Sequence, residues 1–211
     1  MDLNSRDVVV NNATLYQAQA GTISVSLEAQ GNENALGFSL AFDPVAFNFK
    51  GASLGSAASG AALNVNADDA TSGKLGFVLA LNSGANFSVG AKELIKVILQ
   101  PTSQASGSYP VSLTDLPVPR EVSDATASTL TSSYLNGTVT VSAVPSLNIT
   151  RANQSVTLSW PLWASNFVLQ EATAMNAGWT NVTGTAGTNA SQNLITLPAD
   201  STAKFYRLQL P

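Results

Sequence analysis

The amino-acid sequence predicts an all-β protein made of two successive β-sandwiches. Three observations lead to this fold class. Several short segments have an apolar residue at every second position, which is the repeat of a strand with one buried face. These segments follow one another about every 8–12 residues and are separated by glycine, proline, asparagine and aspartate. No segment shows the 3.6-residue period of an amphipathic helix.

The most informative segment runs from Ala35 to Phe49. Large apolar residues at 36, 38, 40 and 42 alternate with small or polar ones, so they are predicted to line the core side of one strand. Asp43 and Pro44 then end this strand, because proline lacks the N–H that a sheet needs and aspartate accepts hydrogen bonds in turns. Phe47 and Phe49 resume the alternation. This pattern is expected where a chain turns a corner of a sandwich.

Before this segment, the chain contains two simpler signals. Residues 7–10 are predicted to form a short apolar edge strand. Gly21 opens a regular alternation in which Ile23, Val25 and Leu27 point into the core.

After it, small residues at 51–60 predict a loop. The run at 91–100 is rich in β-branched residues and ends before Pro101, so we expect a strand that is buried on both faces. Pro117 and Pro119 predict an irregular connection at 116–130. Further strands of this half are predicted at 63–66, 74–81, 109–113 and 138–141.

The residues at 143–145 read as a linker, which divides the chain into predicted domains 1–143 and 144–211. The second domain opens with a predicted hairpin around a turn at 152–154, after which Val156, Leu158 and Trp160 alternate. Further strands are predicted at 167–170, 179–182, 194–197 and 205–208, which makes a second, smaller sandwich.

The composition excludes several classes of function. The 211-residue chain is 45% hydrophobic and only 10% charged, with a net charge of −4, which argues against disorder and against a nucleic-acid partner. No apolar run approaches the ~20 residues of a membrane helix. Cysteine and histidine are absent, so disulfides and Ser-His-Asp or Cys-His catalysis are excluded and a zinc site is disfavoured. We therefore expect a protein that is not an enzyme.

The first residues of the chain contain no basic segment followed by an apolar one, so no signal peptide is expected in this chain. The abundance of serine, threonine and asparagine with little charge favours a secreted protein, located outside the cell or on its surface.

Four stretches of the first half share their order and spacing with a known family. They are Gly21 to Leu27, the block 37–44 with Phe47, the apolar strand 94–99, and the closing run 136–141. With them, residues 8–141 resemble a cohesin domain. The resemblance implies a nine-stranded β-sandwich of jelly-roll topology that binds dockerin domains and assembles extracellular enzymes. At the start of the strand before the corner, where dockerin-binding cohesins present polar contact residues, this chain has Ala35 and Gly37.

The second domain resembles a short β-module at the ends of large secreted bacterial proteins, and its opening is similar to an immunoglobulin-like fibronectin type III domain. The matching residues are 156–161, 167–170, Trp179 with Val182, and 205–208. This resemblance implies no activity.

Asn64, Asn66, Asp68 and Asp69 form a run of oxygen ligands that suggests a calcium loop. An EF-hand needs glycine at its sixth place and glutamate at its twelfth, where this chain has Asp69 and Leu75. A polar turn is therefore the favoured interpretation. Calcium is the alternative, and no other cofactor is predicted.

The carboxylates Asp115, Glu121 and Asp124 occur together in the proline-broken connection. A pair of carboxylates can hydrolyse glycosidic bonds when one of them keeps its proton. No aromatic residue stands beside these three to hold a sugar. We therefore favour a solvated loop.

Three tryptophans are candidates for stacking on a sugar. Trp160 is in phase with the core residues of its strand, and Trp179 is expected to cover the sandwich. Trp163 stands in a loop and is the candidate for an exposed contact, although a buried or half-buried cover is the favoured interpretation.

Together these observations predict non-catalytic protein binding or assembly through a sheet face. A flat face of low charge costs little to desolvate, and serine, threonine and asparagine can provide hydrogen bonds that set the register. Lys74 is one predicted polar contact. The alternatives are a carbohydrate-binding module that uses Trp163, and a structural unit of a bacterial surface fibre or layer whose strand edges pair between copies. The partner is accordingly a dockerin-like protein, a second copy or a polysaccharide.

Overall fold

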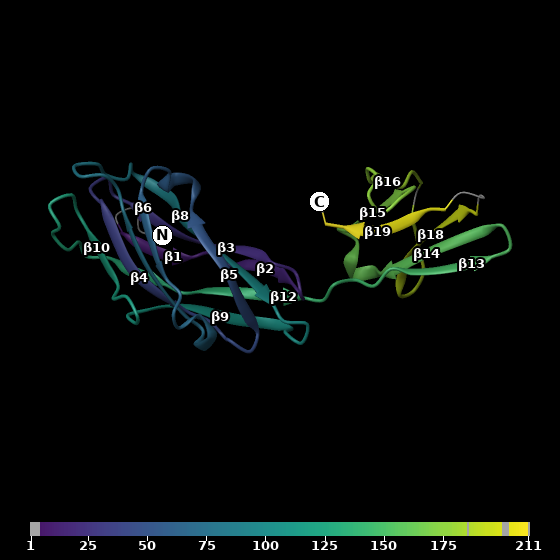
Figure 1. Ribbon diagram of the computed structural model, residues 1–211, viewed down its shortest axis with the longest axis horizontal. Helices are drawn as coiled ribbons and strands as arrows, with labels where there is room; N and C mark the ends of the chain where they lie inside the picture. The colour runs from purple at the N-terminus through teal and green to yellow at the C-terminus, as the bar shows by residue number, and fades with distance from the viewer. Residues whose placement is uncertain (1–4, 185, 200–202, 211) are drawn as a thin grey trace. The chain divides into compact units, whose positions relative to one another are not determined.

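The computed structural model describes residues 5–184, 186–199 and 203–210. The chain divides into two compact units, Met1–Ala143 (unit 1) and Val144–Pro211 (unit 2). Strands dominate both units, and the helices of the described residues are short 3-10 turns such as η1 (Ser56–Ala58) and η2 (Ala70–Ser72) (Figure 1). None of the helices in this described part is long or apolar enough to cross a membrane.

Unit 1 is a sandwich of two sheets (Figure 1). The first sheet has the strand order β11 (Ser133–Leu135), β1 (Asp7–Val10), β3 (Gly21–Ala29), β8 (Gly90–Pro101) and β5 (Phe47–Leu54). The second has the order β2 (Ala13–Tyr16), β12 (Gly137–Ser142), β9 (Gly107–Thr114), β4 (Ala35–Ala41), β7 (Lys74–Ala80) and β6 (Ala62–Asn66), with β10 (Glu121–Ser123) beside β4.

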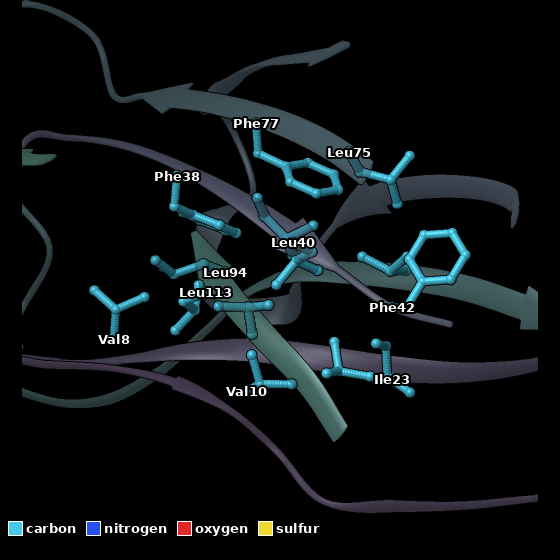
Figure 2. Close-up of a cluster of buried hydrophobic side chains, with 14 of the residues drawn as sticks. Val8, Val10, Ile23, Phe38, Leu40, Phe42, Leu75, Phe77, Leu94 and Leu113 are labelled. Atoms are coloured by element: carbon cyan, nitrogen blue, oxygen red, sulfur yellow. The ribbon is translucent and has the colours of Figure 1, made fainter. Parts of the chain in front are cut away.

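Alternate side chains of both sheets meet in one core between them (Figure 2). Phe38 of β4 and Phe77 of β7 are directly opposite in the strand register and fully buried, with ring centroids 5.4 Å apart. Across the core lie residues of the first sheet such as Ile23, which is 1% exposed. The predicted corner is present: Asp43 accepts a 2.8 Å hydrogen bond from the main-chain N–H of Val45. The predicted inward face of 36, 38, 40 and 42 is confirmed.

The structure corrects several predicted elements. β1 is not an edge strand, because β11 pairs with it in parallel on the side away from β3. β8 is a strand as expected, but its outer face is half-buried at 96, 98 and 100 rather than buried, since solvent borders that face of the sheet. β5 continues through a bulge into the predicted loop at 51–60 and ends at Leu54. The predicted irregular connection at 116–130 contains β10.

Unit 2 is also all-β. One sheet has the order β13 (Asn148–Ala152), β14 (Ser155–Pro161), β18 (Gln192–Pro198) and β17 (Gly187–Thr188). The other has the order β16 (Thr180–Asn181), β15 (Val168–Ala172) and β19 (Phe205–Gln209), and η3 (Leu162–Ala164) follows β14. Both sheets contribute buried residues, among them Leu158, Trp160 and Leu169. The predicted hairpin of β13 and β14 is present.

Candidate functional site

The outer face of the second sheet of unit 1 is built almost entirely from small and uncharged residues. Because side chains alternate along a strand, every second residue of these six strands points away from the core. Among the outward positions of these six described strands, Lys74 is the single charged residue, and β10 beside β4 adds the exposed Glu121. The outward residues are Thr14, Tyr16, Ala35, Gly37, Ser39, Ala41, Ala62, Asn64, Asn66, Lys74, Gly76, Val78, Ala80, Ser108, Pro110, Ser112, Thr114, Thr138, Thr140 and Ser142.

A segment that we call the strap, residues 115–120, crosses this face between β9 and β10. The hydroxyl of Ser39 donates a 2.7 Å hydrogen bond to the carbonyl of Val118 and accepts one of 2.7 Å from its N–H. Ser39 is consequently 0% exposed although it points away from the core. On the far side of the strap, Val122 of β10 is buried in the core and anchors the segment.

Two glycines make room for the strap. A Cβ atom at Gly76 would lie 2.7 Å from a methyl carbon of Val118 and 2.9 Å from the ring of Pro117. A Cβ at Gly37 would lie 3.1 Å from the carbonyl oxygen of Pro119. These glycines in the middle of strands therefore allow a close approach of main chain to sheet, which is a usual reason for glycine in a strand.

An ion pair between Asp115 and Arg120 joins the two ends of the strap. The guanidinium of Arg120 donates hydrogen bonds of 2.9 and 2.8 Å to the two carboxylate oxygens of Asp115, and its main-chain N–H donates one of 3.0 Å. These hydrogen bonds, with the attraction of the positive charge, lower the pKa of Asp115 to about 2. The same guanidinium lies over the ring of Tyr134, 5.1 Å from its centroid.

A groove of about 330 Å³ lies beside the strap. In the strand register Gly37 stands between Val78 of β7 and Glu121 of β10, so its missing side chain leaves a trough between an apolar and an acidic residue. Val118 and Pro119 of the strap close one end of the trough. The remaining lining residues are Ala35, Leu36, Ser123 and Ala127.

The structure brings together only some of the predicted site residues. Ala35 and Gly37 line the groove. Lys74 lies on the same outer face, opposite Ala41 in the register and outside the groove. The strap was not predicted from the sequence to lie on this face. The signal that could have found it is the small outward set 37, 39 and 76, which leaves space over two central strands.

The carboxylates of the connection do not form a catalytic pair. Asp115 pairs with Arg120, and Glu121 accepts a 2.7 Å hydrogen bond from the hydroxyl of Thr129. Asp124 accepts hydrogen bonds from the turn that follows it, and these lower its pKa. Each of the three carboxylates thus has its own local hydrogen-bond partner, and none of them is held against another.

The candidate calcium ligands lie at the end of β6 and in the turn after it. The amide oxygen of Asn66 accepts a 3.1 Å hydrogen bond from the N–H of Asp68, which is the polar turn that the sequence favoured. Nowhere in the described ranges do three histidine, cysteine, aspartate or glutamate side chains come together as a metal-ligand group. Calcium binding at Asn64, Asn66, Asp68 and Asp69 stays a prediction.

The three tryptophans have different environments. Trp160 is 5% exposed and belongs to the core of unit 2, as predicted. Trp179 is half-buried under Arg207, whose guanidinium lies 4.4 Å from its ring centroid. Trp163 of η3 is 54% exposed, so the favoured interpretation of a buried or half-buried cover is wrong for this residue.

No protein-family model matches the sequence, and no curated protein matches it. Solved structures do match. The chain is similar to the cohesin CaCohA2 of Clostridium acetobutylicum in complex with CaDoc0917, with a TM-score of 0.57, 15% identity, and 65% of this chain aligned to all of that one. It is similar to the sixth cohesin of scaffoldin B from Acetivibrio cellulolyticus in complex with the Cel5 dockerin, with a TM-score of 0.57, 16% identity, and 66% of this chain aligned to all of that one.

A third match is the non-cellulosomal cohesin of the archaeon Archaeoglobus fulgidus, with a TM-score of 0.55, 14% identity, and 65% of this chain aligned to 91% of that one. The aligned share is close to the share of the chain in Met1–Ala143, the larger sandwich. Unit 1 has the cohesin fold. The predicted all-β jelly-roll sandwich is therefore confirmed for this unit. At an identity of 14–16%, the likeness to cohesins shows the fold of unit 1 alone. Its binding partner has to be inferred from its surface.

Proposed function

We propose that this chain is a non-catalytic docking module that binds a protein partner through the outer face of the β2–β12–β9–β4–β7–β6 sheet. The observation that carries the proposal is the composition of the six strands of this face outside the strap, which are free of charge at nearly every outward position and rich in serine, threonine and asparagine. Removing water from such a face costs little, because few charges lose their hydration.

Three hydroxyl groups on this face form a row across neighbouring strands. Thr14, Thr140 and Ser108 follow one another in register across β2, β12 and β9, and the hydroxyl oxygens of Thr140 and Ser108 are 3.5 Å apart. Each hydroxyl can both donate and accept a hydrogen bond. Such a row suits the main chain or polar side chains of a partner and sets the partner's position along the face.

The partner that we propose is a dockerin-like domain. Two of the similar structures are cohesins in complex with a dockerin, which supports this class of partner through the shared fold. We also propose that the protein works outside the cell or on its surface, as its low charge and its serine- and threonine-rich composition suggest.

The test is binding of the full chain to a panel of dockerin domains, including the Cel5 dockerin, measured by biolayer interferometry. Thr140→Arg places a long charged side chain on the proposed face, and Thr22→Arg makes the same change at an exposed threonine of the other sheet. We expect the first variant to weaken binding at least about tenfold and the second to leave it unchanged. Equal effects of both variants would contradict docking through this face, and no binding across the panel would contradict a dockerin-like partner.

One observation favours a second candidate, sugar binding by unit 2. Trp163 is 54% exposed beside Leu162, which is 37% exposed, so an aromatic ring is available for stacking on a sugar. Glycan-array binding that disappears in Trp163→Ala would support this candidate. An array on which the unchanged chain binds no polysaccharide would contradict it.

Another observation favours a third candidate, a structural unit of a surface fibre or layer. All five residues of the edge strand β13 are exposed, and Ile149 among them is 55% exposed. Open strand edges can pair between copies. Polymers that grow with protein concentration in sedimentation velocity would support this candidate, whereas a strict monomer would contradict it.

A further inference from the structure

The groove beside the strap has a shape and a charge that suit one kind of side chain. Its volume of about 330 Å³ lies at the lower limit for small-molecule sites, and it is an open trough rather than an enclosed cavity. The trough therefore fits a side chain of a docked protein better than it fits a cofactor.

The two sides of the trough differ in chemistry. On one side Val78 is 45% exposed, although its strand neighbours at 77 and 79 are fully buried. On the other side stands the exposed carboxylate of Glu121. Val78, Gly37 and Glu121 are in register on three adjacent strands, so the apolar and acidic sides are about 10 Å apart, from two strand spacings.

Within the described part of the chain, the carboxylate of Glu121 forms no ion pair. Its hydrogen bond comes from the neutral hydroxyl of Thr129, and no lysine or arginine of the described residues lies within ion-pair distance. The guanidinium of the neighbouring Arg120 is held by Asp115 and by the ring of Tyr134. Unit 1 as a whole has eleven acidic and six basic residues, so its field favours a cation.

We propose that the trough receives a lysine or arginine side chain of the docked partner. The apolar stem lies in the trough along Ala35 and Val78, beside the strap residue Val118, and the cationic end pairs with Glu121. Long basic side chains characteristically bury their stem on apolar surface and keep the charge at a polar rim. The glycine at 37 is required for the close approach of the strap, which forms one wall of this arrangement. This inference rests on the proposed function, since it names the partner group that the docking face selects.

The probes are two short peptides, acetyl-Gly-Lys-Gly-amide and its norleucine analogue, which has a stem of the same length and no charge. They are titrated into the ¹⁵N-labelled full chain. We expect the lysine peptide to shift the amide signals of Ala35, Gly37, Val78 and Glu121 in a saturable way, and the norleucine peptide to shift them several-fold less. Shifts spread evenly over the acidic residues of the surface, or equal shifts from both peptides, would overturn the inference.

Glu121→Gln is the decisive variant, because the amide oxygen can still accept the hydrogen bond of Thr129 while the charge is lost. Glu28→Gln is its matched control, since Glu28 points outward from β3 on the other sheet. We expect Glu121→Gln to abolish the lysine-specific shifts and to weaken a dockerin that binds the chain about two- to fivefold, as for an ion pair at a rim. The weakening should fade in high salt. Glu28→Gln should change neither result.

The outcomes separate this inference from the proposed function. If a dockerin binds the chain and Glu121→Gln binds it as tightly as the unchanged chain, the trough assignment is wrong and docking stands. If no dockerin binds while the lysine peptide still shifts the trough residues in a Glu121-dependent way, the trough assignment stands and the proposed partner is wrong.

Discussion

Replacing Ser39 with alanine is expected to release the strap and leave the core intact. The hydroxyl of Ser39 makes two hydrogen bonds of 2.7 Å with the main chain of Val118, one as donor and one as acceptor. Ser39 points away from the core, so its truncation opens no cavity among the apolar residues of the sandwich. The main-chain N–H and carbonyl of Val118 lose their partner.

The size of the effect follows from these two hydrogen bonds. Each one contributes about 1 kcal/mol net, and a polar group left buried without a partner costs about 1–3 kcal/mol. Val118 is half-buried, so water can replace part of what is lost. We expect the free energy of unfolding of unit 1 to fall by about 2 kcal/mol, which lowers its Tm by about 7 °C for a domain of this size.

The positions of the tryptophans allow the two units to be followed separately. All three lie in Val144–Pro211, so tryptophan fluorescence reports on unit 2, whereas far-ultraviolet circular dichroism reports on both units. Ser39→Ala should lower the Tm of the unit 1 transition seen by circular dichroism and leave the Tm of the fluorescence transition unchanged. Hydrogen exchange at the Val118 amide should become faster. Ser112→Ala, an outward serine of the neighbouring strand β9, is the control. A shift of Ser39→Ala no larger than that of this control would refute the reasoning.

Three further predictions concern charges and one buried nitrogen. Hydrogen bonds from Arg120 lower the pKa of Asp115 to about 2, so this carboxylate stabilises the fold above about pH 4 and loses that effect as the pH falls towards 2. Asp115→Asn should therefore lower the Tm at neutral pH, with a difference that shrinks as the pH falls below about 4 and is lost below about 2 in a thermal melt series. Burial alone would raise the pKa of Glu33, but hydrogen bonds from main-chain N–H groups and from Arg6 outweigh it, and its pKa is lowered. Glu33→Gln leaves the charge of Arg6 unpaired, so the free energy of unfolding measured in urea should fall by about 3 kcal/mol near neutral pH. The difference from the unchanged chain should become smaller as the pH falls through the lowered pKa of Glu33. A difference that does not depend on pH would contradict this. The ring N–H of Trp160 is buried and has no hydrogen-bond partner among the described residues. Trp160→Phe should therefore change the free energy of unfolding of unit 2, measured in urea, by less than about 1 kcal/mol, and a loss above about 3 kcal/mol would show that the N–H is satisfied.

Local alternation was sufficient to predict the main strands of unit 1. The burial of Phe38, Leu40 and Phe42 and of the inward residues of β3 follows from a period of two, which is a property of neighbouring residues. The corner at Asp43 follows in the same way from the hydrogen bonding of one short side chain. β2, β10 and β11 have only three or four residues, too few to show a period, and unlike the equally short β1 they contain no run of apolar residues, so they were not predicted.

The candidate site was decided by tertiary structure. Ser39 and Val118 are 79 residues apart in the chain, and the residues that surround each of them in the sequence do not predict this contact. Gly37 was interpreted as a departure from the polar contacts of dockerin-binding cohesins, whereas in the fold it is the space that the strap and the trough occupy. The sequence by itself determined which faces of the strands are buried, because that depends on residues two positions apart. Which segment crosses the outer face depends on how distant strands are ordered in the sheet, and only the folded chain specifies that order.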